Sequence, residues 1–486
     1  MTARDNPARK AAREGKTVND KANPSKRRTT RGAAPAAWNK KAAGGEMNPA
    51  TRKERREVRI VEATTHPADR RPLSSDTTLY DAMVIGGGAA GLMAAVALSR
   101  AGVRTILLEK QDRVGRKLLS TGNGRCNLTH LGARAEDYHG AREAARTALA
   151  AWPPTRITDA FAALGVPCVA DEASRVYPMS RQAASVLDAL RLACDEAGVV
   201  THTGFAVTRL ETRDGGFEAR SAEGESVRAR CALVCTGGLA APKLGASGEG
   251  YRMLERFGHA ITPRFAAITA LRTPPEAVRG LKGLRAEGKI ALWADGECVR
   301  EERGELLFAD YGVSGIAAMQ LGRAANEALR AGKDCAAHID LLPDADAAAM
   351  LRARAETLPM RGMEDFLNGI VPKRLGQALA RAAGIDMKLN AAALTPAMIA
   401  RLAATLTDWT LSIIGVQDFD QAQVTAGGAS LADFDARTMQ SLRAPGLFAA
   451  GEILDVDGDC GGFNLQWAWS SARMAAAGIE AFLKGE

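Results

Sequence analysis

The amino-acid sequence predicts an α/β fold in which one nucleotide-binding domain is interrupted by a long insert. Glycine-rich segments lie at 81–91 and 450–475, each joined to an apolar run. About 360 residues separate them, far more than one βαβ unit needs. Between them the chain first becomes a series of short strand-like pieces and then an Ala-, Leu- and Arg-rich sequence typical of helices. We therefore expect a Rossmann-like domain interrupted by an inserted β-rich, barrel-like domain and an α-helical domain.

The first elements form a strand–turn–helix–strand unit. The apolar run 79–85 predicts a buried strand, 89–101 a helix and 103–109 a second strand. The 18 residues 82–99 carry no charge, but their three consecutive glycines favour this unit over a membrane helix. The unit is the first half of a dinucleotide-binding fold.

The rest of the first domain alternates helices and strands. Residues 141–165 and 180–198 are expected to be helices, the second opening at Ser180 and ending before Gly198. The apolar alternation predicts strands at 199–210, 217–222 and 232–236. Cys231 and Cys235 are the ends of the apolar run CALVC, which overlaps the last of these strands and is expected to be buried.

The insert begins near residue 259. Strand-like pieces at 261–273, 285–292, 297–299 and 305–308 are separated by Gly and Pro. Residues 344–410 are expected to be helical and divided near Pro372 and Pro396, and α/β texture returns at 422–425. The predicted boundaries are a basic tail at 1–78, the first domain at 79–258 and 422–486, the β-rich domain at 259–343 and the helical domain at 344–421.

The charge of the chain is unevenly placed. Residues 1–78 hold 19 Lys and Arg against nine Asp and Glu, a net charge of +10, whereas the whole chain has +8. The tail has too little periodic apolar sequence to offset its ordering entropy, so we expect it to be disordered. It could bind RNA. It could also be an artefact of an upstream start codon, since Met47 is another possible start.

The cysteines and the polar N-terminus indicate a cytoplasmic protein. The eight cysteines contain no CxxC pair and no ladder of short spacings, which favours reduced thiols over disulfides or a zinc site. No metal site is predicted. No signal peptide is expected, because the first 78 residues are polar.

The turn after the first strand carries the dinucleotide fingerprint. Gly86, Gly88 and Gly91 have G-x-G-x-x-G spacing, which permits a tight turn, close approach of a pyrophosphate and helix–strand packing. A helix N-terminus beginning there favours an anion. Glu109, at the end of the second strand, is placed to accept hydrogen bonds from ribose hydroxyls. The alternative is a glycine-rich turn with no ligand.

Several later segments have compositions suited to binding other parts of the same dinucleotide. The loop 115–129 combines cations, glycines and small polar residues, Thr236-Gly237-Gly238 follows a buried strand, and Gly461-Gly462 opens the last helix. The residues predicted to bind the cofactor are Gly86, Gly88, Ala89, Ala90, Gly91, Glu109, Lys110, Arg116, Lys117, Gly122, Gly124, Arg125, Cys126, Asn127, Val207, Thr236, Gly237, Gly238, Gly451, Glu452, Gly461, Gly462, Asn464, Leu465 and Gln466. No second fingerprint exists, since 245–250 has neither the spacing nor a preceding strand, so a nicotinamide donor would lack a Rossmann site of its own.

Two cysteines lie inside these motifs. If the dinucleotide is FAD, the thiols of Cys126 and Cys460 are candidate catalytic groups, because a thiol beside a flavin can protonate the carbon opposite the one that accepts a hydride. The alternative for each is a small residue packed against the cofactor. Trp467 and Trp469 are expected in the core.

The strings GGGAAGL, GRKLLSTGNGRCNLT, ELLFADYGVSG, VTAGG, TMQS and AGEILDVDGDCGGFNLQWAWSSA resemble the BaiN/RdsA family of NAD(P)/FAD-dependent oxidoreductases, also called YhiN-like flavoproteins. The resemblance spans about 79–486. It implies an FAD-binding domain interrupted by a β-rich and a helical domain. Within the family, one branch is linked to reduction of a steroid enone and another reduces a uridine of large-subunit ribosomal RNA. His130, Phe463 and the Ala309-Asp310 pair depart from the commonest family pattern.

The expected function is reduction of a conjugated carbon–carbon double bond with FAD and NAD(P)H. The favoured substrate is a uridine of large-subunit ribosomal RNA, giving dihydrouridine. A small-molecule enone is the alternative, and a non-catalytic flavin-dependent RNA-binding or assembly factor is a third. Ribosomal RNA would be bound by the tail or by a basic patch in the helical half of the insert. This patch consists of Arg361, Lys373, Arg374, Arg381 and Lys388. The same residues could equally be a solvated helix face.

Overall fold

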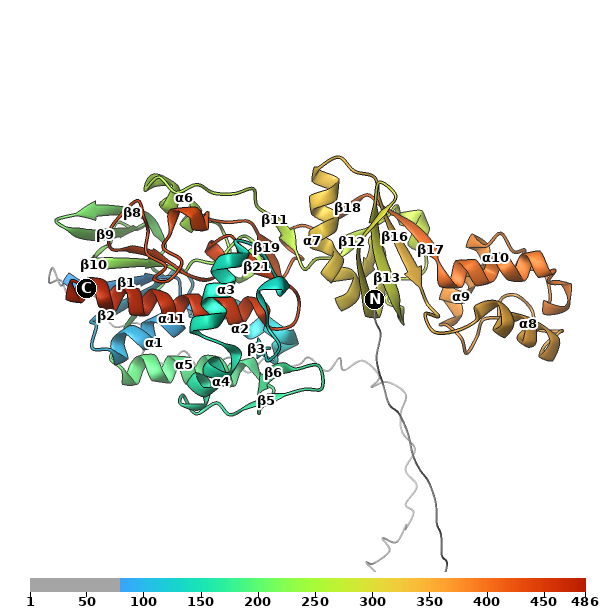
Figure 1. The fold of residues 1–486 in the computed structure, drawn as a ribbon, viewed down its shortest axis with the longest axis horizontal. Helices are drawn as coiled ribbons and strands as arrows, with labels where there is room; N and C mark the ends of the chain where they lie inside the picture. Colours follow the sequence, from blue (N-terminus) through green and yellow to red (C-terminus); the bar gives the residue numbers. More distant parts are fainter. Residues whose placement is uncertain (1–78) are drawn as a thin grey trace, which may run out of the picture. The chain divides into compact units, whose positions relative to one another are not determined.

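The computed structural model describes residues 79–486. The predictions for the tail at 1–78 concern residues outside this range. Figure 1 shows a mixed α/β part containing both ends of the described chain, and a part formed by the middle of the sequence. Two separate apolar cores underlie these parts, one built from residues before 258 and after 428, the other from residues 271–413. The predicted fold class, a nucleotide-binding domain with a β-rich and helical insert, is confirmed.

The first core surrounds a seven-stranded sheet in the order β7-β2-β1-β10-β9-β8, with β20 also paired to β10. The strands β7, β2, β1, β10 and β20 run parallel to one another. The strands β9 and β8 extend the sheet beyond β10 in antiparallel pairing. Residues 82–84 of β1 are fully buried, as expected for a strand covered on both faces. The strands are β1 (Leu79–Ile85), β2 (Thr105–Glu109), β7 (Val200–Thr203), β8 (Val207–Arg213), β9 (Gly216–Ser221), β10 (Ser226–Val234) and β20 (Leu447–Ala449).

Helices cover this sheet, and α1 packs directly on the long C-terminal helix α11 (Figure 1). Small side chains permit the close approach, since half of the residues of α1 are Ala or Gly. The helices are α1 (Ala89–Arg100), α2 (Arg116–Ser120), α3 (Arg142–Ala151), α4 (Pro154–Ala162), α5 (Ala183–Glu196), α6 (Glu249–Arg256) and α11 (Phe463–Lys484). Short strands complete this part: β3 (Thr129–His130), β4 (Tyr138–Gly140), β5 (Cys168–Ala170), β6 (Arg175–Pro178) and β21 (Val456–Gly458).

The insert contains an antiparallel sheet in the order β17-β16-β13-β14-β15-β12-β18. Only Ile414 separates the two end strands, and its N–H donates to the carbonyl of Arg272 on β12 at 2.9 Å, so the chain closes the sheet in a barrel-like manner. The strands are β12 (Leu271–Arg272), β13 (Arg285–Ala294), β14 (Glu297–Ala309), β15 (Gly312–Ser314), β16 (Cys335–Asp340), β17 (Trp409–Ile413) and β18 (Gly415–Val416). The helices are α7 (Ile316–Arg330), α8 (Ala347–Thr357), α9 (Lys373–Ala382) and α10 (Pro396–Thr407). At the junction, β11 (Phe265–Ala267) pairs with β19 (Val424–Ala426).

Several element predictions were wrong in detail. The helix expected over 141–165 is two helices, because Pro153 and Pro154 interrupt the backbone hydrogen bonding. The helix expected from Ser180 begins at Ala183. The strand expected over 199–210 breaks at Gly204, where φ is +76°, and the pieces 297–299 and 305–308 are two ends of the single strand β14.

Pattern reasoning also missed elements of the insert. The helix α7 and the strands β16 and β17 were not predicted, and the first two residues of β17 fall at the end of the stretch 344–410 that was expected to be helical. The domain boundaries at 258, 343 and 421 stay predictions. Among residues 79–486, no helix combines the length and apolar character needed to cross a membrane.

Candidate functional site

A cavity of about 590 Å³ lies at the carboxyl ends of the parallel strands β1, β2 and β10, where ligands of open α/β sheets bind. It collects segments from both ends of the chain. The predicted cofactor residues that line it are Gly86, Gly88, Ala89, Ala90, Glu109, Lys110, Arg116, Lys117, Gly122, Arg125, Asn127, Val207, Thr236, Gly237, Gly238, Gly451, Glu452, Gly461, Gly462, Asn464 and Leu465. The candidate thiol of Cys460 lies there as well.

Four of the predicted site residues do not line the cavity: Gly91, Gly124, Cys126 and Gln466. Gln466 is fully buried, accepting a hydrogen bond from Thr129 and donating one to the carbonyl of Trp152. Cys126 is also fully buried, and burial raises the pKa of its thiol to about 12. These placements favour packing roles for Cys126 and Gln466.

The three fingerprint glycines occupy different environments. A Cβ on Gly86 would lie 2.5 Å from the carbonyl oxygen of Cys235, and φ at Gly86 is +107°. A Cβ on Gly91 would lie 1.9 Å from the carbonyl oxygen of Gly86. A Cβ on Gly88 would meet no protein atom within 4 Å, so the bare backbone there faces open space. Gly86 and Gly91 therefore serve the fold, and Gly88 leaves room for a ligand.

Glu109 is anchored as an acceptor at the end of β2. Its carboxylate accepts hydrogen bonds from the backbone N–H of Gly87 at 2.7 Å and of Gln111 at 2.8 Å. Burial raises the pKa of Glu109 above its usual range, and those two hydrogen bonds partly offset the shift. The fixed carboxylate keeps free lone pairs for the hydroxyls of a ribose.

Two helix N-termini face the cavity. The helix α1 begins after Gly88 and α11 begins after Gly462, and neither has an acidic residue in its first turn. Their N–H groups and dipoles favour an anion or a developing negative charge. A dinucleotide could use both, with its pyrophosphate on one helix and its ring system near the other.

Further polar groups of the cavity fit such a ligand. The buried atoms Asn127 Oδ1 and Thr236 Oγ1 have no hydrogen-bond partner within the described chain, and both residues line the cavity. Lys117 donates to Glu452 Oε2 at 2.7 Å, while the other oxygen of Glu452 accepts from the N–H of Thr425. Unpaired buried polar atoms cost free energy, so a polar ligand at this position would stabilise the site. The donor set fits FAD.

Cys460 lies between the cavity and the insert. Burial raises the pKa of its thiol, Arg175 opposes that shift, and the carboxylates of Asp459 and Glu302 reinforce it. The thiol is therefore held in its protonated form at neutral pH, the state needed in a proton donor.

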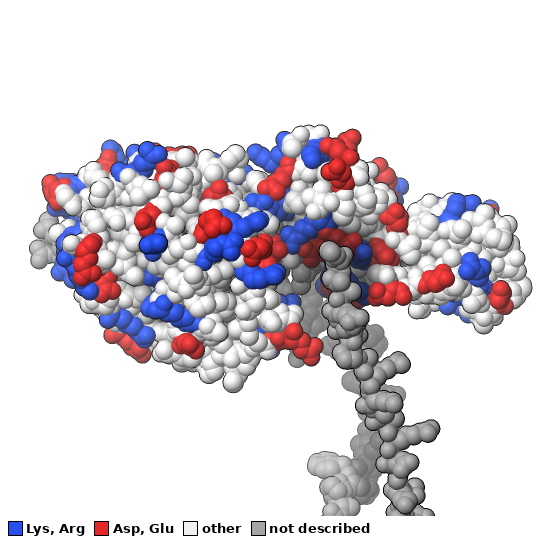
Figure 2. All heavy atoms as spheres, in the orientation of Figure 1, with Lys and Arg blue, Asp and Glu red and all other residues white. Residues whose placement is uncertain are grey.

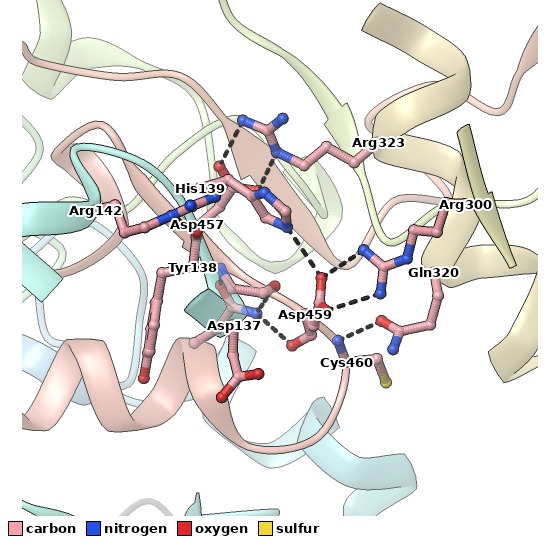
Figure 3. A network of polar contacts seen from close by, with 12 residues as sticks. Asp137, Tyr138, His139, Arg142, Arg300, Gln320, Arg323, Asp457, Asp459 and Cys460 are labelled. Carbon is pink, nitrogen blue, oxygen red and sulfur yellow. Dashed lines mark hydrogen bonds and ion pairs between the residues drawn. The ribbon is translucent and has the colours of Figure 1, made fainter. Parts of the chain in front are cut away.

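A polar network behind Cys460 was missed by sequence reasoning (Figure 3). Asp459 accepts two hydrogen bonds from Arg300, at 3.0 and 2.8 Å, and lies 3.0 Å from Nε2 of His139. Burial alone would raise the pKa of Asp459, but the hydrogen bonds from His139 and Arg300 outweigh it and hold that pKa at about 2. The partners come from distant segments, so the only local signal was the run of three aspartates in DVDGD.

The charged lining also includes residues that no motif indicated. Arg175 and Arg181 line the cavity together with Arg125. Arg175 donates to Asp171 at 2.9 Å, and the guanidinium of Arg181 lies 4.7 Å from the ring centre of Tyr177. Arg175 acts electrostatically on Cys460, which places this basic group near the thiol.

Two of the departures from the family pattern prove to be neighbours. The rings of His130 and Phe463 are stacked with their centres 4.9 Å apart, at the start of α11. The third departure is on the insert surface, where Asp310 accepts a hydrogen bond from Lys282. The first two therefore form one packed pair beside the site.

The fold and the cavity define the class of protein, a Rossmann-type oxidoreductase with an FAD site. Residues 80–478 match the family described as HI0933-like protein Rossmann domain, and the chain belongs to this family. The resemblance to the BaiN/RdsA flavoproteins is thereby confirmed. Within residues 79–486, no group of three or more His, Cys, Asp or Glu side chains is placed to hold a metal ion.

The chain aligns with nearly the full length of two relatives. The 3-dehydro-bile acid delta(4,6)-reductase of Clostridium scindens is 35% identical over 398 residues, covering 81% of this chain and 97% of the relative. The ribosomal RNA dihydrouridine synthase of Escherichia coli K12 is 31% identical over 402 residues, covering 82% and 97%. By name these relatives act on unlike substrates, a bile acid and a ribosomal RNA.

Proposed function

We propose that this protein reduces a carbon–carbon double bond conjugated with a carbonyl group, with NAD(P)H as electron donor, and that its substrate is a uridine of large-subunit ribosomal RNA. The observation that carries the proposal is that Cys460, a thiol whose pKa is raised by burial, lies in the same cavity as the dinucleotide turn. The names of both relatives are compatible with such a reduction.

Different residues of the chain would bind the cofactor, stabilise charge and donate the proton. FAD, when bound and reduced, supplies a hydride. The turn at Gly88, the carboxylate of Glu109 and the N-terminus of α1 would hold its adenosine and pyrophosphate. The N-terminus of α11 would stabilise negative charge near the ring system by about 0.3–2 kcal/mol. The Cys460 thiol would deliver a proton to the substrate carbon next to the one that accepts the hydride.

The substrate preference rests on charge. Arg125 and Arg181 line the cavity without a carboxylate partner among the ion pairs of the described chain, and Arg175 pairs with Asp171 through Nε alone. Guanidinium groups at the mouth of a site suit the phosphates that flank a nucleotide. A small-molecule enone is the second candidate, favoured by the 35% identity to the bile-acid reductase.

The deciding experiment compares modified nucleosides in ribosomal RNA. A strain lacking this protein should lose one dihydrouridine from its large-subunit RNA, detected by mass spectrometry. A gene for the wild-type protein should restore it, and one for Cys460→Ala should not. Intact dihydrouridine in the deletion strain, together with enone-dependent oxidation of NAD(P)H by the pure protein, would establish the second candidate instead.

A further inference from the structure

The insert contacts the segment 457–460 at three points. Besides the Arg300–Asp459 pair, Arg323 of α7 donates to both oxygens of Asp457, at 2.8 and 3.4 Å. The side chain of Asp457 is only 1% exposed, so this second ion pair is buried. Gln320, also on α7, accepts a hydrogen bond from the backbone N–H of Cys460 at 2.6 Å (Figure 3).

The nucleotide-binding domain holds the same loop from the other side, where Nε2 of His139 lies 3.0 Å from Asp459. Residues of β21 pair with β4, the N–H of Asp459 donates to the carbonyl of Asp137 at 3.1 Å, and Asn464 bonds to Gly458. Beyond Cys460, Gly461 and Gly462 have φ of +146° and +104°, conformations that favour glycine. Among the hydrogen bonds within residues 79–486, none from this side reaches Cys460 itself.

The surroundings of Cys460 come from the insert and its junction strands. The residue packs against a small apolar cluster formed by Ala267, Ile268, Val424 and Ala426, to which Met319 of α7 also belongs. The backbone of Cys460 is thus held by Gln320 of α7. Its side chain packs against the same apolar cluster as Met319, the residue that precedes Gln320 in α7.

We propose that Arg300 and Gln320 are positioning residues: through them the insert, and not the nucleotide-binding domain alone, sets where the Cys460 thiol lies in the cavity. The insert also supplies Ile316 to the cavity wall, so the insert would place both a wall of the substrate space and the thiol. The effect on turnover rests on the proposed function, but the position of the thiol can be measured without a substrate.

The test is the rate at which iodoacetamide alkylates Cys460, followed by peptide mass spectrometry on the FAD-loaded protein. Cys298 is exposed and serves as an internal reference. Gln320→Ala removes the bond to Cys460 without a change of charge, and should raise the alkylation of Cys460 roughly fivefold, as the loss of one hydrogen bond allows. Arg303→Met is the matched control, because Arg303 lies on β14 like Arg300 but pairs with Asp344 at the surface.

Arg300→Met and Arg300→Lys extend the test. The carboxylates of Asp459 and Glu302 would lose their guanidinium in Arg300→Met, which raises the pKa of the thiol, while a loosened loop exposes it. Alkylation is therefore followed from pH 7 to 10, and the limiting rate at high pH reports access. That rate should rise in Arg300→Met and be partly restored in Arg300→Lys.

Two readouts separate this inference from the proposed reaction. If the thiol is the proton donor, reduction of the flavin by NAD(P)H should stay normal in Gln320→Ala while product formation falls about tenfold or more, because displacement by 1 Å can cost about 10²-fold. Raised alkylation with unchanged product formation would support the positioning and contradict the proton-donor role. Equal limiting alkylation rates in wild type, Gln320→Ala and the Arg300→Met/Gln320→Ala double variant would overturn the inference.

Discussion

At the scale of single residues, the site is built from groups whose immediate contacts differ although their sequence context is similar. Gly88 and Gly91 belong to one fingerprint, yet only Gly91 is closed in by protein atoms. Cys126 and Cys460 both lie in cofactor motifs, yet only Cys460 reaches the cavity.

Gly88→Val should give a folded protein that purifies without yellow colour, because the new side chain would occupy the space of the pyrophosphate and its Cβ would meet no protein atom within 4 Å. Gly91→Ala should instead lower the free energy of unfolding by roughly 1–3 kcal/mol, the cost typical of overpacking. Absorbance at 450 nm and denaturant unfolding measure the two effects. Full FAD content in Gly88→Val would contradict the assignment of this turn.

The wild-type protein should release FAD, and not FMN, when it is denatured. The Glu109→Ala variant should purify with most of its FAD lost. Because burial raises the pKa of Glu109, its carboxylate becomes protonated at a higher pH than usual as the pH falls. Ribose hydroxyls donate to the ionised form, so FAD affinity should fall as the pH drops through this raised pKa. Measuring the affinity for FAD at pH values between 7 and 4 tests this expectation. An affinity that does not change with pH would argue against the ribose contact.

Cys460→Ala should keep FAD and accept electrons from NAD(P)H, yet lose roughly 10²–10⁴-fold in product formation, the usual share of a general acid. Cys126→Ala should change turnover little, since its thiol does not line the cavity. Stopped-flow measurement of the two half-reactions separates flavin reduction from product formation. Equal turnover in wild type and both variants would make the two cysteines packing residues.

At the scale of elements, side-chain caps stabilise two helices of the insert, α8 and α10. The Asp346 side chain caps α8 by accepting a hydrogen bond from the N–H of Ala349 at 2.9 Å, and Thr395 caps α10 similarly. Neither cap lies near the cavity residues, so the stability of the helical part can be varied separately from the site.

Asp346→Ala should therefore lower stability by about 1 kcal/mol, the usual value of an N-cap, while FAD content and flavin reduction stay unchanged. Urea unfolding monitored by circular dichroism and by flavin fluorescence would show the change. Asp346→Asn is the control, because an asparagine cap should retain most of the stability. A loss of FAD in Asp346→Ala would show that the helical part supports the cofactor site.

At the scale of the whole molecule, electrostatics must explain how a nearly neutral body would bind RNA. Excluding the tail, the chain has a net charge near −2. Figure 2 shows basic and acidic side chains interspersed over the visible face of the described residues. Within the predicted basic patch of the insert, Lys373 already pairs with Asp365 at 2.8 Å. The tail is therefore the stronger candidate for long-range attraction.

Deletion of residues 1–78 should leave FAD binding intact, because no cofactor residue lies there. If the tail contributes phosphate contacts, the truncated protein should bind ribosomal RNA more weakly and with a smaller dependence on salt. Binding assays between 50 and 200 mM salt measure both quantities. Unchanged affinity and salt slope would leave the tail without a role in RNA binding.

The sequence by itself determined the strand–turn–helix unit at 79–109 and the class of cofactor site, because glycine spacing and buried strands are local properties of the chain. It also indicated an insert, although α7, β16 and β17 escaped detection where short apolar runs fit helix and strand equally. Only the tertiary structure separated Cys460 from Cys126 and brought Arg300 and Gln320 to the loop. Those partners are 159 and 140 residues from the groups they bind, a distance over which packing of the insert, and no sequence pattern, decides which side chains meet.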